Sequence, residues 1–491
     1  MKIPVERKKT IIYPDKKRVI ARFFFNGEER AVKLIERILT LSDKEVEGLM
    51  YQILREFSKR HRSITTIFKR NYLQVESIVK ECCQENHLSE RKKLLIGSYF
   101  TMEYAIESAA LFNPSIVEDF DQSELQAGQK RVIISLRATG EGHLSSLIFR
   151  RAVIDKNNEI NMIEAGDQIG EAERIKDHIY QKKYFEKKIK DMDIEENISS
   201  MVLERLPDKF KYDQISEVVQ KIKRMECCSS PLCKKSIDEI LWLADSHSTI
   251  RFSFDTDISE RVIFPASRIE KKGIEDARFT RFVKDDGTII YYGTYTAYDG
   301  YTILPKLIAT KDFCDFEAFP LHGKYAINKN LALFPRKING KYVMISRVDG
   351  INNYIMFSKN LQRWNKAEIL SEPLNSWELI QVGNGGSPIE TEKGWLLITH
   401  GVGPVRKYCL SACLLDLEDP SKVIGKLNEP LLLPDEKERS GYVPNVVYTC
   451  GTIVHNGHLI IPYAMSDYAS SFASVNMGIL LNKLTETIIN P

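Results

Sequence analysis

Runs of apolar residues, each opened by a turn and closed by a polar residue, recur along the C-terminal half of the chain. The turns contain Gly287, Gly340, Gly394 and Gly457, which are spaced 53, 54 and 63 residues apart. The runs that follow them read TIIYYGTY, KYVMISR, WLLITH and HLIIPYAMSD. Periods of about 40–50 residues with several short strands in each unit are the signature of a β-propeller. The pattern therefore predicts a propeller with one such strand in each blade.

Three of these strands end in a residue with a charged or ring-nitrogen side chain. They are Arg347, His400 and Asp467. In a propeller the equivalent strand of each blade runs along a central channel, so equivalent strand ends meet around one axis. The spacing thus predicts a polar site for a small ligand at one mouth of the channel.

Residues 1–110 show a mostly helical pattern after a strand-like start at 19–25. Ser42 with Glu45 forms a capping-box signature, and apolar residues at a spacing of three to four follow over 46–57. The segment 98–112 also has the composition of an apolar helix. The stripe over 46–57 packs either on the chain's own propeller or against another subunit of a homo-oligomer, and the sequence leaves both open.

From about residue 111 the pattern changes to strands, beginning with a hairpin whose arms are 131–138 and 145–154. Charged helices interrupt it at about 170–248. The hairpin and the four repeats together give five blades. We therefore predict an all-β, five-bladed β-propeller over 111–491, with an N-terminal helical extension over 1–110 and a helical insertion.

The composition excludes several other classes. The net charge is only +3, so nothing global indicates nucleic-acid binding, and 43% apolar residues suffice for a large core. No apolar run reaches the roughly 18 residues that span a membrane. The start MKIPVERKK lacks the apolar core of a signal peptide, which predicts a cytoplasmic protein. The nine cysteines show no paired C-x-x-C motifs, which favours free thiols over a metal site.

Candidate chemistry gathers at the predicted strand ends. Glu275 and Asp276 of GIEDARF stand at the entry of a strand and could supply a general acid, or they form an exposed acidic turn. Other strand ends carry groups suited to an anion; these are Lys329, Arg347, His400 and Tyr408. Each has an ordinary structural alternative, a salt bridge for the cations and a core position for the rings. Their common register across the blades favours the site.

At these residues the chain resembles glycoside hydrolase family 130, the β-mannoside phosphorylases and related β-mannosidases. The resembling strings are FNPS (112–115), SLR (135–137), GIEDARF (273–279), TAYDG (296–300), NKNLALFPRKINGKYVMISR (328–347), GNGGSPIETEKGWLLITHGVG (383–403), YCLSACLLDLEDP (408–420), GYVPNVVYTCG (441–451) and PYAMSD (462–467). They are spread in order over most of the range 111–482. The resemblance implies a five-bladed propeller with its site at one end of the channel.

Carried over by position, the resemblance also implies roles for single residues. Asp276 matches the general acid of the family. The positions that bind inorganic phosphate in the phosphorylases are matched by Lys329, Arg347, His400 and Tyr408. Substrate-binding positions are matched by Asn113, Ser115, Arg137, Asp299 and Asp467. No metal and no cofactor other than inorganic phosphate is implied.

The sequence departs from the family at a few places, such as EDAR for the commoner EDPR and Lys329 where some members have arginine. The resemblance implies an inverting β-mannoside phosphorylase acting on terminal β-mannosyl units, with α-mannose 1-phosphate as product. An inverting β-mannosidase of the same family and a non-catalytic sugar-binding propeller are the alternatives. The sequence fixes neither the linkage nor the acceptor sugar.

Overall fold

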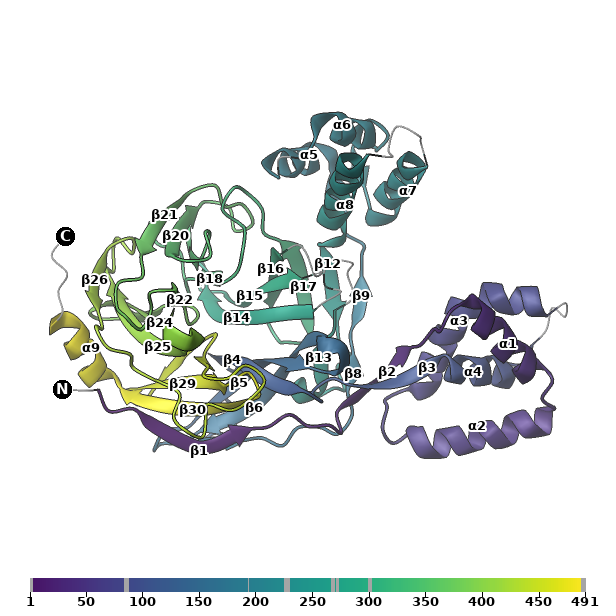
Figure 1. Cartoon of the computed structure of the whole chain (residues 1–491), viewed down its shortest axis with the longest axis horizontal. Coiled ribbons are helices and arrows are strands. Elements are labelled where there is room, and N and C mark those ends of the chain that lie inside the picture. The colour runs from purple at the N-terminus through teal and green to yellow at the C-terminus, as the bar shows by residue number, and fades with distance from the viewer. Residues whose placement is uncertain are drawn as a thin grey trace.

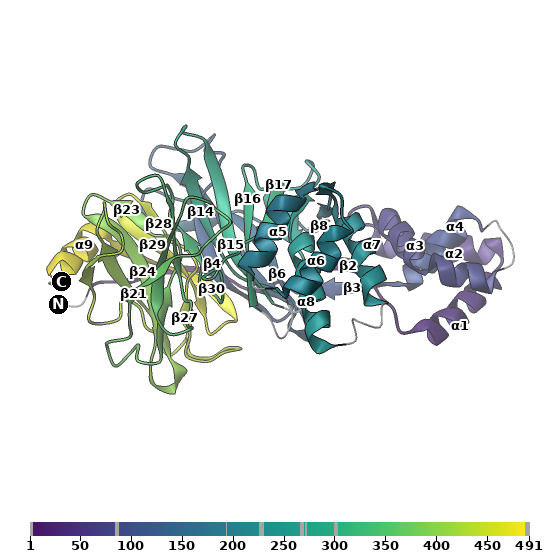
Figure 2. The same ribbon diagram turned by 90° about the horizontal axis from the view of Figure 1, so that it is seen from above.

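The computed structural model describes residues 3–83, 88–192, 194–224, 230–265, 270, 273–298 and 303–486. Strands form one rounded body, and helices are added to it in separate places (Figure 1). Helices α1–α4 project to one side beyond the ribbon β2–β3, and α5–α8 stand on another edge (Figures 1 and 2). The predicted mostly-β chain with N-terminal helices and a helical insertion is confirmed.

The strand-rich body contains four separate sheets. The largest has twelve strands, and its two halves meet at a single parallel pair, Gly273 with Ser145. One half is built on β4 (Ala110–Glu118), β5 (Lys130–Thr139), β6 (Ser145–Ile154) and β7 (Ile160–Met162), beside the short β8 (Gly170–Glu171) and β13 (Arg261–Ile263). The other half contains β14 (Gly273–Val283), β15 (Ile289–Tyr298), β16 (Ile303–Thr310), β17 (Asp315–Pro320), β12 (Ser248–Arg251) and β9 (Glu173–Ile175).

Three smaller sheets follow along the chain. The first contains β18 (Ala332–Leu333), β19 (Tyr342–Ser346), β20 (Asn353–Ser358) and β21 (Ala367–Ser371). The second contains β22 (Gln381–Asn384), β23 (Ile389–Thr391), β24 (Gly394–Val402), β25 (Tyr408–Leu415) and β26 (Val423–Lys426). The third contains β27 (Val447–Tyr448), β28 (Ile453–His455), β29 (His458–Met465), β30 (Ala469–Asn476) and β1 (Glu6–Ile12), and α9 (Met477–Glu486) follows it.

Alternating side chains join each group of strands to both of its neighbours. On β19, Met344 packs toward the β14–β17 half, whereas Val343 and Ile345 pack toward the β24–β25 sheet. On β5, Ile133 packs toward β14 and β15, whereas Ile134 packs against β29 and β30. The period of two residues along a strand places successive side chains on opposite faces. Every group of strands is therefore covered on both faces, and the last group packs against the first.

The first strand of the chain completes the last sheet. β1 pairs with β30 through Glu6 with Ser474 and Ile12 with Ser470, across a chain separation of more than 450 residues. Figure 1 shows β1 running beside β30. Part of the predicted N-terminal extension thus belongs to the strand-rich body.

The N-terminal helices have a core of their own. They are α1 (Glu28–Leu39), α2 (Asp43–Phe57), α3 (Ile64–Cys82) and α4 (Glu90–Tyr99), carried on β2 (Val19–Phe23) and β3 (Thr101–Ala105). The predicted capping box of α2 is confirmed, because the Ser42 hydroxyl accepts from Glu45 N and Glu45 accepts from Ser42 N. The prediction of a helix over 98–112 is wrong. Residues 101–105 pair with β2 instead, which satisfies their backbone groups in a ladder.

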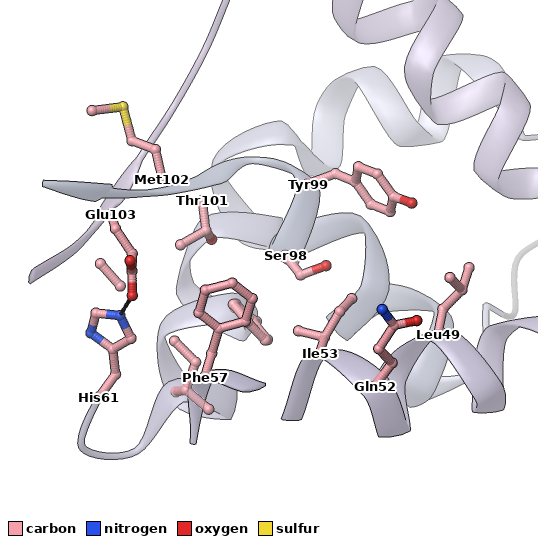
Figure 3. Close-up of a pocket in the computed structure, with 13 residues that line it drawn as sticks. Leu49, Gln52, Ile53, Phe57, His61, Ser98, Tyr99, Thr101, Met102 and Glu103 are labelled. Atoms are coloured by element: carbon pink, nitrogen blue, oxygen red, sulfur yellow. Dashed lines mark hydrogen bonds and ion pairs between the residues drawn. The ribbon is translucent and has the colours of Figure 1, made fainter. Parts of the chain in front are cut away.

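Helix α2 packs on the other N-terminal helices. Its buried residues Val46 and Met50 join the core formed with α1, α3 and α4. Leu49, Ile53 and Phe57 line a cavity of about 490 Å³, whose lining also includes the hydrogen-bonded pair of His61 and Glu103 (Figure 3). The stripe therefore packs within its own group of helices and not on the strand-rich body, with Leu49, Ile53 and Phe57 only partly buried, and the homo-oligomer stays a prediction.

The insertion contains α5 (Lys182–Asp191), α6 (Glu196–Glu204), α7 (Tyr212–Lys223) and α8 (Pro231–Asp245), with the ribbon β10 (Tyr180–Gln181) and β11 (Lys209–Phe210). Cysteines 82, 83, 314, 409, 413 and 450 are free thiols, as predicted. Cys233 is disulfide-bonded, which corrects that prediction at this position. Within the described ranges, no helix is long and apolar enough to cross a membrane, and no cluster of metal-binding side chains occurs.

Candidate active site

The predicted site residues lie on strands or next to them in all parts of the strand-rich body. They are Asn113 on β4, Arg137 on β5, Asp276 on β14, Lys329 before β18, Arg347 after β19, His400 on β24, Tyr408 on β25 and Asp467 between β29 and β30. Ser115 lies on β4. Asp299 lies outside the described residues. Apart from Ser115 and Asp299, direct contacts and mutual electrostatic effects connect these side chains into one site.

Asp276 lies within β14, and a β-bulge directs its side chain. The register with β15 shifts between Glu275 and Arg278, and Asp276 has a positive φ of 53°. Asn113 has a φ of 51° at a second bulge, on β4. Its Nδ2 donates to Oδ1 of Asp276 at 2.6 Å. Bulges re-aim side chains and occur beside active sites, so two of them bring this carboxylate and amide together.

A row of alternating charges lies next to Asp276. Arg137 Nη2 donates to Glu275 Oε1 at 2.7 Å, and Lys329 Nζ donates to Glu275 Oε2 at 2.6 Å. Arg137 Nη1 also lies 3.6 Å from Oδ1 of Asp276. Glu275 is therefore a bridge between the two cations. It was predicted only as one of two strand-entry carboxylates, and its role as the partner of Lys329 comes from the structure.

Arg278 connects Asp276 to the other side of the site. Its Nη1 donates to the backbone oxygen of Asp276 at 2.8 Å, and its Nη2 donates to the hydroxyl of Tyr448 at 2.7 Å. Its Nε donates to Oδ1 of Asn384 at 3.2 Å. Arg278 is 2% exposed, so these bonds fix its side chain in a buried position. Arg278, Tyr448 and Asn384 were not predicted as site residues, although all three lie in the strings that carry the resemblance.

His400 lies close enough to Arg278 to be affected by its charge. Its Nδ1 donates to the backbone oxygen of Asn384 at 3.1 Å, while its Nε2 is buried without a hydrogen-bond partner among the described residues. Burial lowers the pKa of His400 well below its ordinary value, and the charges of Arg347 and Arg278 act in the same direction. Its ring therefore stays neutral, and Nε2 is offered as an acceptor.

The surroundings of His400 are aromatic and cationic. Its ring lies 6.0 Å from that of Tyr408 and 4.9 Å from that of Tyr448, measured between centroids. Nε of Arg347 is likewise buried without a partner in the described part of the chain. A side chain cannot replace Gly383, because a Cβ there would lie 2.5 Å from His400 Nε2. The absence of a side chain at Gly383 therefore leaves room for the imidazole ring of His400.

The two aspartates of the site have opposite pKa shifts. Burial alone would raise the pKa of Asp276, but the charges of Arg137, Arg278 and Lys329 outweigh it. The pKa of Asp276 thus lies below its ordinary value. Burial raises the pKa of Asp467 to about 7, and the negative charge of Asp276 acts in the same direction. Carboxyl groups whose environments push their pKa values apart are typical of acid–base sites.

Ser115 has a structural partner. Its hydroxyl accepts from Phe279 N at 3.1 Å and the residue is 1% exposed. The bond ties β4 to β14 next to both bulges. A substrate contact at Ser115 stays a prediction.

Residues 233–486, just over half of the chain, match the model of a family described as β-1,4-mannooligosaccharide phosphorylase. The chain belongs to glycoside hydrolase family 130. It is therefore a carbohydrate-active enzyme from a family of glycoside phosphorylases and glycosidases, and the alternative of a non-catalytic sugar-binding protein is wrong. The match includes Asp276, the four predicted phosphate residues and Asp467, whereas Asn113, Ser115 and Arg137 precede it.

Curated relatives agree with this membership. A 1,2-β-oligomannan phosphorylase from Thermoanaerobacter sp. (strain X514) is 41% identical over 42% of this chain and 70% of its own length. A β-1,2-mannobiose phosphorylase from Listeria innocua serovar 6a is 30% identical over 45% of this chain and 63% of its own length. Among solved structures, a β-1,2-mannobiose phosphorylase from Listeria innocua in complex with β-1,2-mannobiose aligns with a TM-score of 0.46, at 21% identity, over 77% of this chain and 92% of that one. The aligned parts of the two curated relatives cover about two thirds of their length.

Proposed function

We propose that this family 130 enzyme is an inverting β-mannoside phosphorylase, which moves a terminal β-mannosyl unit of an oligosaccharide onto inorganic phosphate. The proposal rests on two buried polar atoms, Arg347 Nε and His400 Nε2, which lack a hydrogen-bond partner among the described residues. The cations of Lys329 and Arg137 lie beside Asp276 in the same site. The names of the curated relatives, all phosphorylases of mannosides, support the same substrate class.

The reaction follows from this arrangement as a single displacement. A phosphate oxygen attacks the anomeric carbon, and the bond from that carbon to the glycosidic oxygen breaks. The leaving oxygen takes a proton from Asp276, directly or through a sugar hydroxyl. The products are α-mannose 1-phosphate and an acceptor shortened by one unit. Phosphate is already nucleophilic, so cations that hold it in line replace the base carboxylate that a hydrolase requires.

Each predicted phosphate ligand has a part that suits its side chain. Arg347 offers a guanidinium fork to two phosphate oxygens. Neutral His400 offers an acceptor to the P–OH of hydrogenphosphate, which a second cation could not do. Lys329 would move from Glu275 toward the anion, and Tyr408 closes the site beside His400. No cofactor besides inorganic phosphate is required by this scheme.

One observation favours the hydrolytic alternative, an inverting β-mannosidase. Asp467 has a pKa of about 7, and a general base works best when its pKa is near the working pH. In that reaction Asp467 would take a proton from water, and Asp276 would still protonate the leaving oxygen. The two reactions differ in whether phosphate is consumed.

We also propose that the strand-rich body is a five-bladed propeller with its catalytic part over 111–491. Its five groups of strands each pack on the next, and alternating residues such as those of β5 and β19 serve two neighbours. The N-terminal helices and the insertion at about 170–248 are additions to this unit. β1 would then close the last blade as a strand from the opposite end of the chain.

Product analysis tests the proposed reaction. The enzyme is incubated with β-1,2- and β-1,4-mannobiose, with and without phosphate, and products are followed by phosphorus and proton NMR. We expect α-mannose 1-phosphate only when phosphate is present, and elongation of an acceptor when α-mannose 1-phosphate is supplied. Free mannose released at the same rate with and without phosphate would establish the mannosidase instead.

A further inference from the structure

Two exposed aromatic side chains meet near the site although they lie 299 residues apart in the chain. The Tyr442 hydroxyl and His143 Nδ1 are 3.0 Å apart, and their ring centroids are separated by 5.3 Å. Tyr442 is 57% exposed, and His143 is exposed as well. A solvent-exposed hydrogen bond of this kind contributes little to folding. The proposed reaction assigns no role to this pair.

Both side chains stand on loops directly beside the site. His143 lies in the loop 140–144 between β5 and β6, only six positions after Arg137. The loop of Tyr442 packs on the turn of Asp467, where Val443 N donates to Ser466 O at 3.0 Å. A Cβ at Gly441 would lie 2.4 Å from Ser466 O, so the two segments are in close contact. The pair therefore belongs to the rim of the site rather than to its floor.

A third rim residue shows that the loops open toward the same site. Arg406, exposed in the loop between β24 and β25, lowers the pKa of Asp467 through its charge. Its φ of 53° and that of Val405, 57°, repeat the φ values of His143, 58°, and Gly142, 67°. The two hairpin loops thus contain the same type of turn. In each loop the last residue with a positive φ, His143 or Arg406, lies at the rim of the site.

The N-terminal strands hold both halves of the aromatic pair. The Tyr104 hydroxyl on β3 donates to Glu141 O at 2.9 Å and approaches Leu144 O at 3.3 Å, which fixes the loop of His143. Arg7 on β1 forms two bonds to Glu438, at 2.8 and 2.9 Å, in the segment that leads to Tyr442. Both strands lie outside residues 233–486, the part matched by the family model.

We propose that His143 and Tyr442 form a platform for the sugar unit on the leaving-group side of a β-linked manno-oligosaccharide, and that Tyr104 positions it. The inference rests on the proposed function, in which only the terminal unit reaches Asp276 and the rest of the chain extends toward solvent. Aromatic ring faces are electron-rich and pack against the C–H groups of a pyranose ring. The Tyr442 hydroxyl and the His143 nitrogens supply polar contacts to sugar hydroxyls at the same place.

Kinetics with the full-length protein test the platform. Tyr442→Ala and His143→Ala are compared with wild type on β-linked mannobiose and mannotriose at saturating phosphate. We expect each to raise the KM for the oligosaccharide about tenfold, the value of one aromatic contact, with an unchanged KM for phosphate. Tyr104→Phe removes only the hydroxyl and should raise the same KM with kcat unchanged. Tyr51→Ala, at a tyrosine on α2 that is 71% exposed, is the matched control, and thermal unfolding verifies that every variant is folded.

The outcomes separate the platform from the reaction. If wild type turns over the oligosaccharides but neither Ala variant changes their KM, the platform is refuted while the proposed function stands. If wild type hydrolyses them without phosphate and the variants raise KM, the platform stands and phosphorolysis is refuted. If wild type neither turns over nor binds β-1,2- or β-1,4-linked probes by calorimetry, both are refuted.

Discussion

Replacing Asp467 by asparagine should stabilise the protein at alkaline pH and have little effect at acid pH. The pKa of Asp467 is about 7 in the folded protein, against 3.8 for an ordinary aspartate. Between these two values the folded state keeps a proton that the unfolded chain releases. The free energy of unfolding therefore falls as the pH rises from 3.8 to about 7, and the full decrease is reached above the pKa of the folded state.

The size of the effect follows from the shift. Each pKa unit corresponds to about 1.36 kcal/mol. The carboxyl of Asp467 thus lowers the free energy of unfolding by up to about 4 kcal/mol at pH 8, with partial solvent access reducing this figure. Because an amide does not titrate, the stability of Asp467→Asn relative to wild type should grow by roughly 3–4 kcal/mol between pH 4 and pH 8.

Denaturant unfolding at a series of pH values measures this difference directly. Asp286→Asn, at an exposed turn position between β14 and β15, is the control and should show no such growth. In an Asp276→Asn background the growth should shrink, because the charge of Asp276 is one cause of the raised pKa of Asp467. A difference between Asp467→Asn and wild type that stays constant from pH 4 to pH 8 would refute the reasoning and place the carboxylate in ordinary solvent contact.

Three further changes have definite expected outcomes. Asp276→Asn keeps the shape and the partner Asn113 but removes the proton, so turnover of a natural disaccharide should fall by about 10²–10⁴-fold. Turnover of a nitrophenyl mannoside should fall less. A variant that keeps more than a tenth of the wild-type activity on the disaccharide would exclude Asp276 as the acid. Arg347→Ala should raise the KM for phosphate by roughly 10–150-fold and that for the sugar much less, and the reverse pattern would move Arg347 to the mannosyl subsite. Met50→Ala should destabilise the N-terminal helices by about 2–4 kcal/mol in hydrogen exchange, while light scattering of wild type decides whether they also form an oligomer.

The sequence indicated much of the fold because alternation and turns are local properties. The four turn glycines preceded real strands, β15, β19, β24 and β29, and the capping box of α2 formed as predicted. The pairing of β1 with β30 joins the two ends of the chain, and no local pattern shows such a contact. The helix predicted over 98–112 became two strands, since the ladder with β2 outweighs helix propensity there.

The site was predictable at the level of residue type and strand end, but not at the level of contacts. Arg347, His400 and Asp467 stood out because each closes a repeated strand. The bulges at Asn113 and Asp276 add a residue to one strand without a sequence signature, and they produce the 2.6 Å bond between these side chains. The ion pair of Lys329 with Glu275 is equally invisible in the sequence, because the two residues lie 54 positions apart and no local pattern joins them.

The charges of the ligand-free site bear on how the acid works. In that state the proton prefers Asp467, whose pKa is raised, over Asp276, whose pKa is lowered by three neighbouring cations. In the proposed phosphorolysis, a phosphate dianion beside Arg347 and Lys329 would offset those cations and raise the pKa of Asp276, so binding of the nucleophile would itself prepare the acid. Activated leaving groups need no proton, which is why the nitrophenyl mannoside is decisive. If it restored activity to Asp467→Asn and not to Asp276→Asn, the proton would come from Asp467 and the two roles would have to be exchanged.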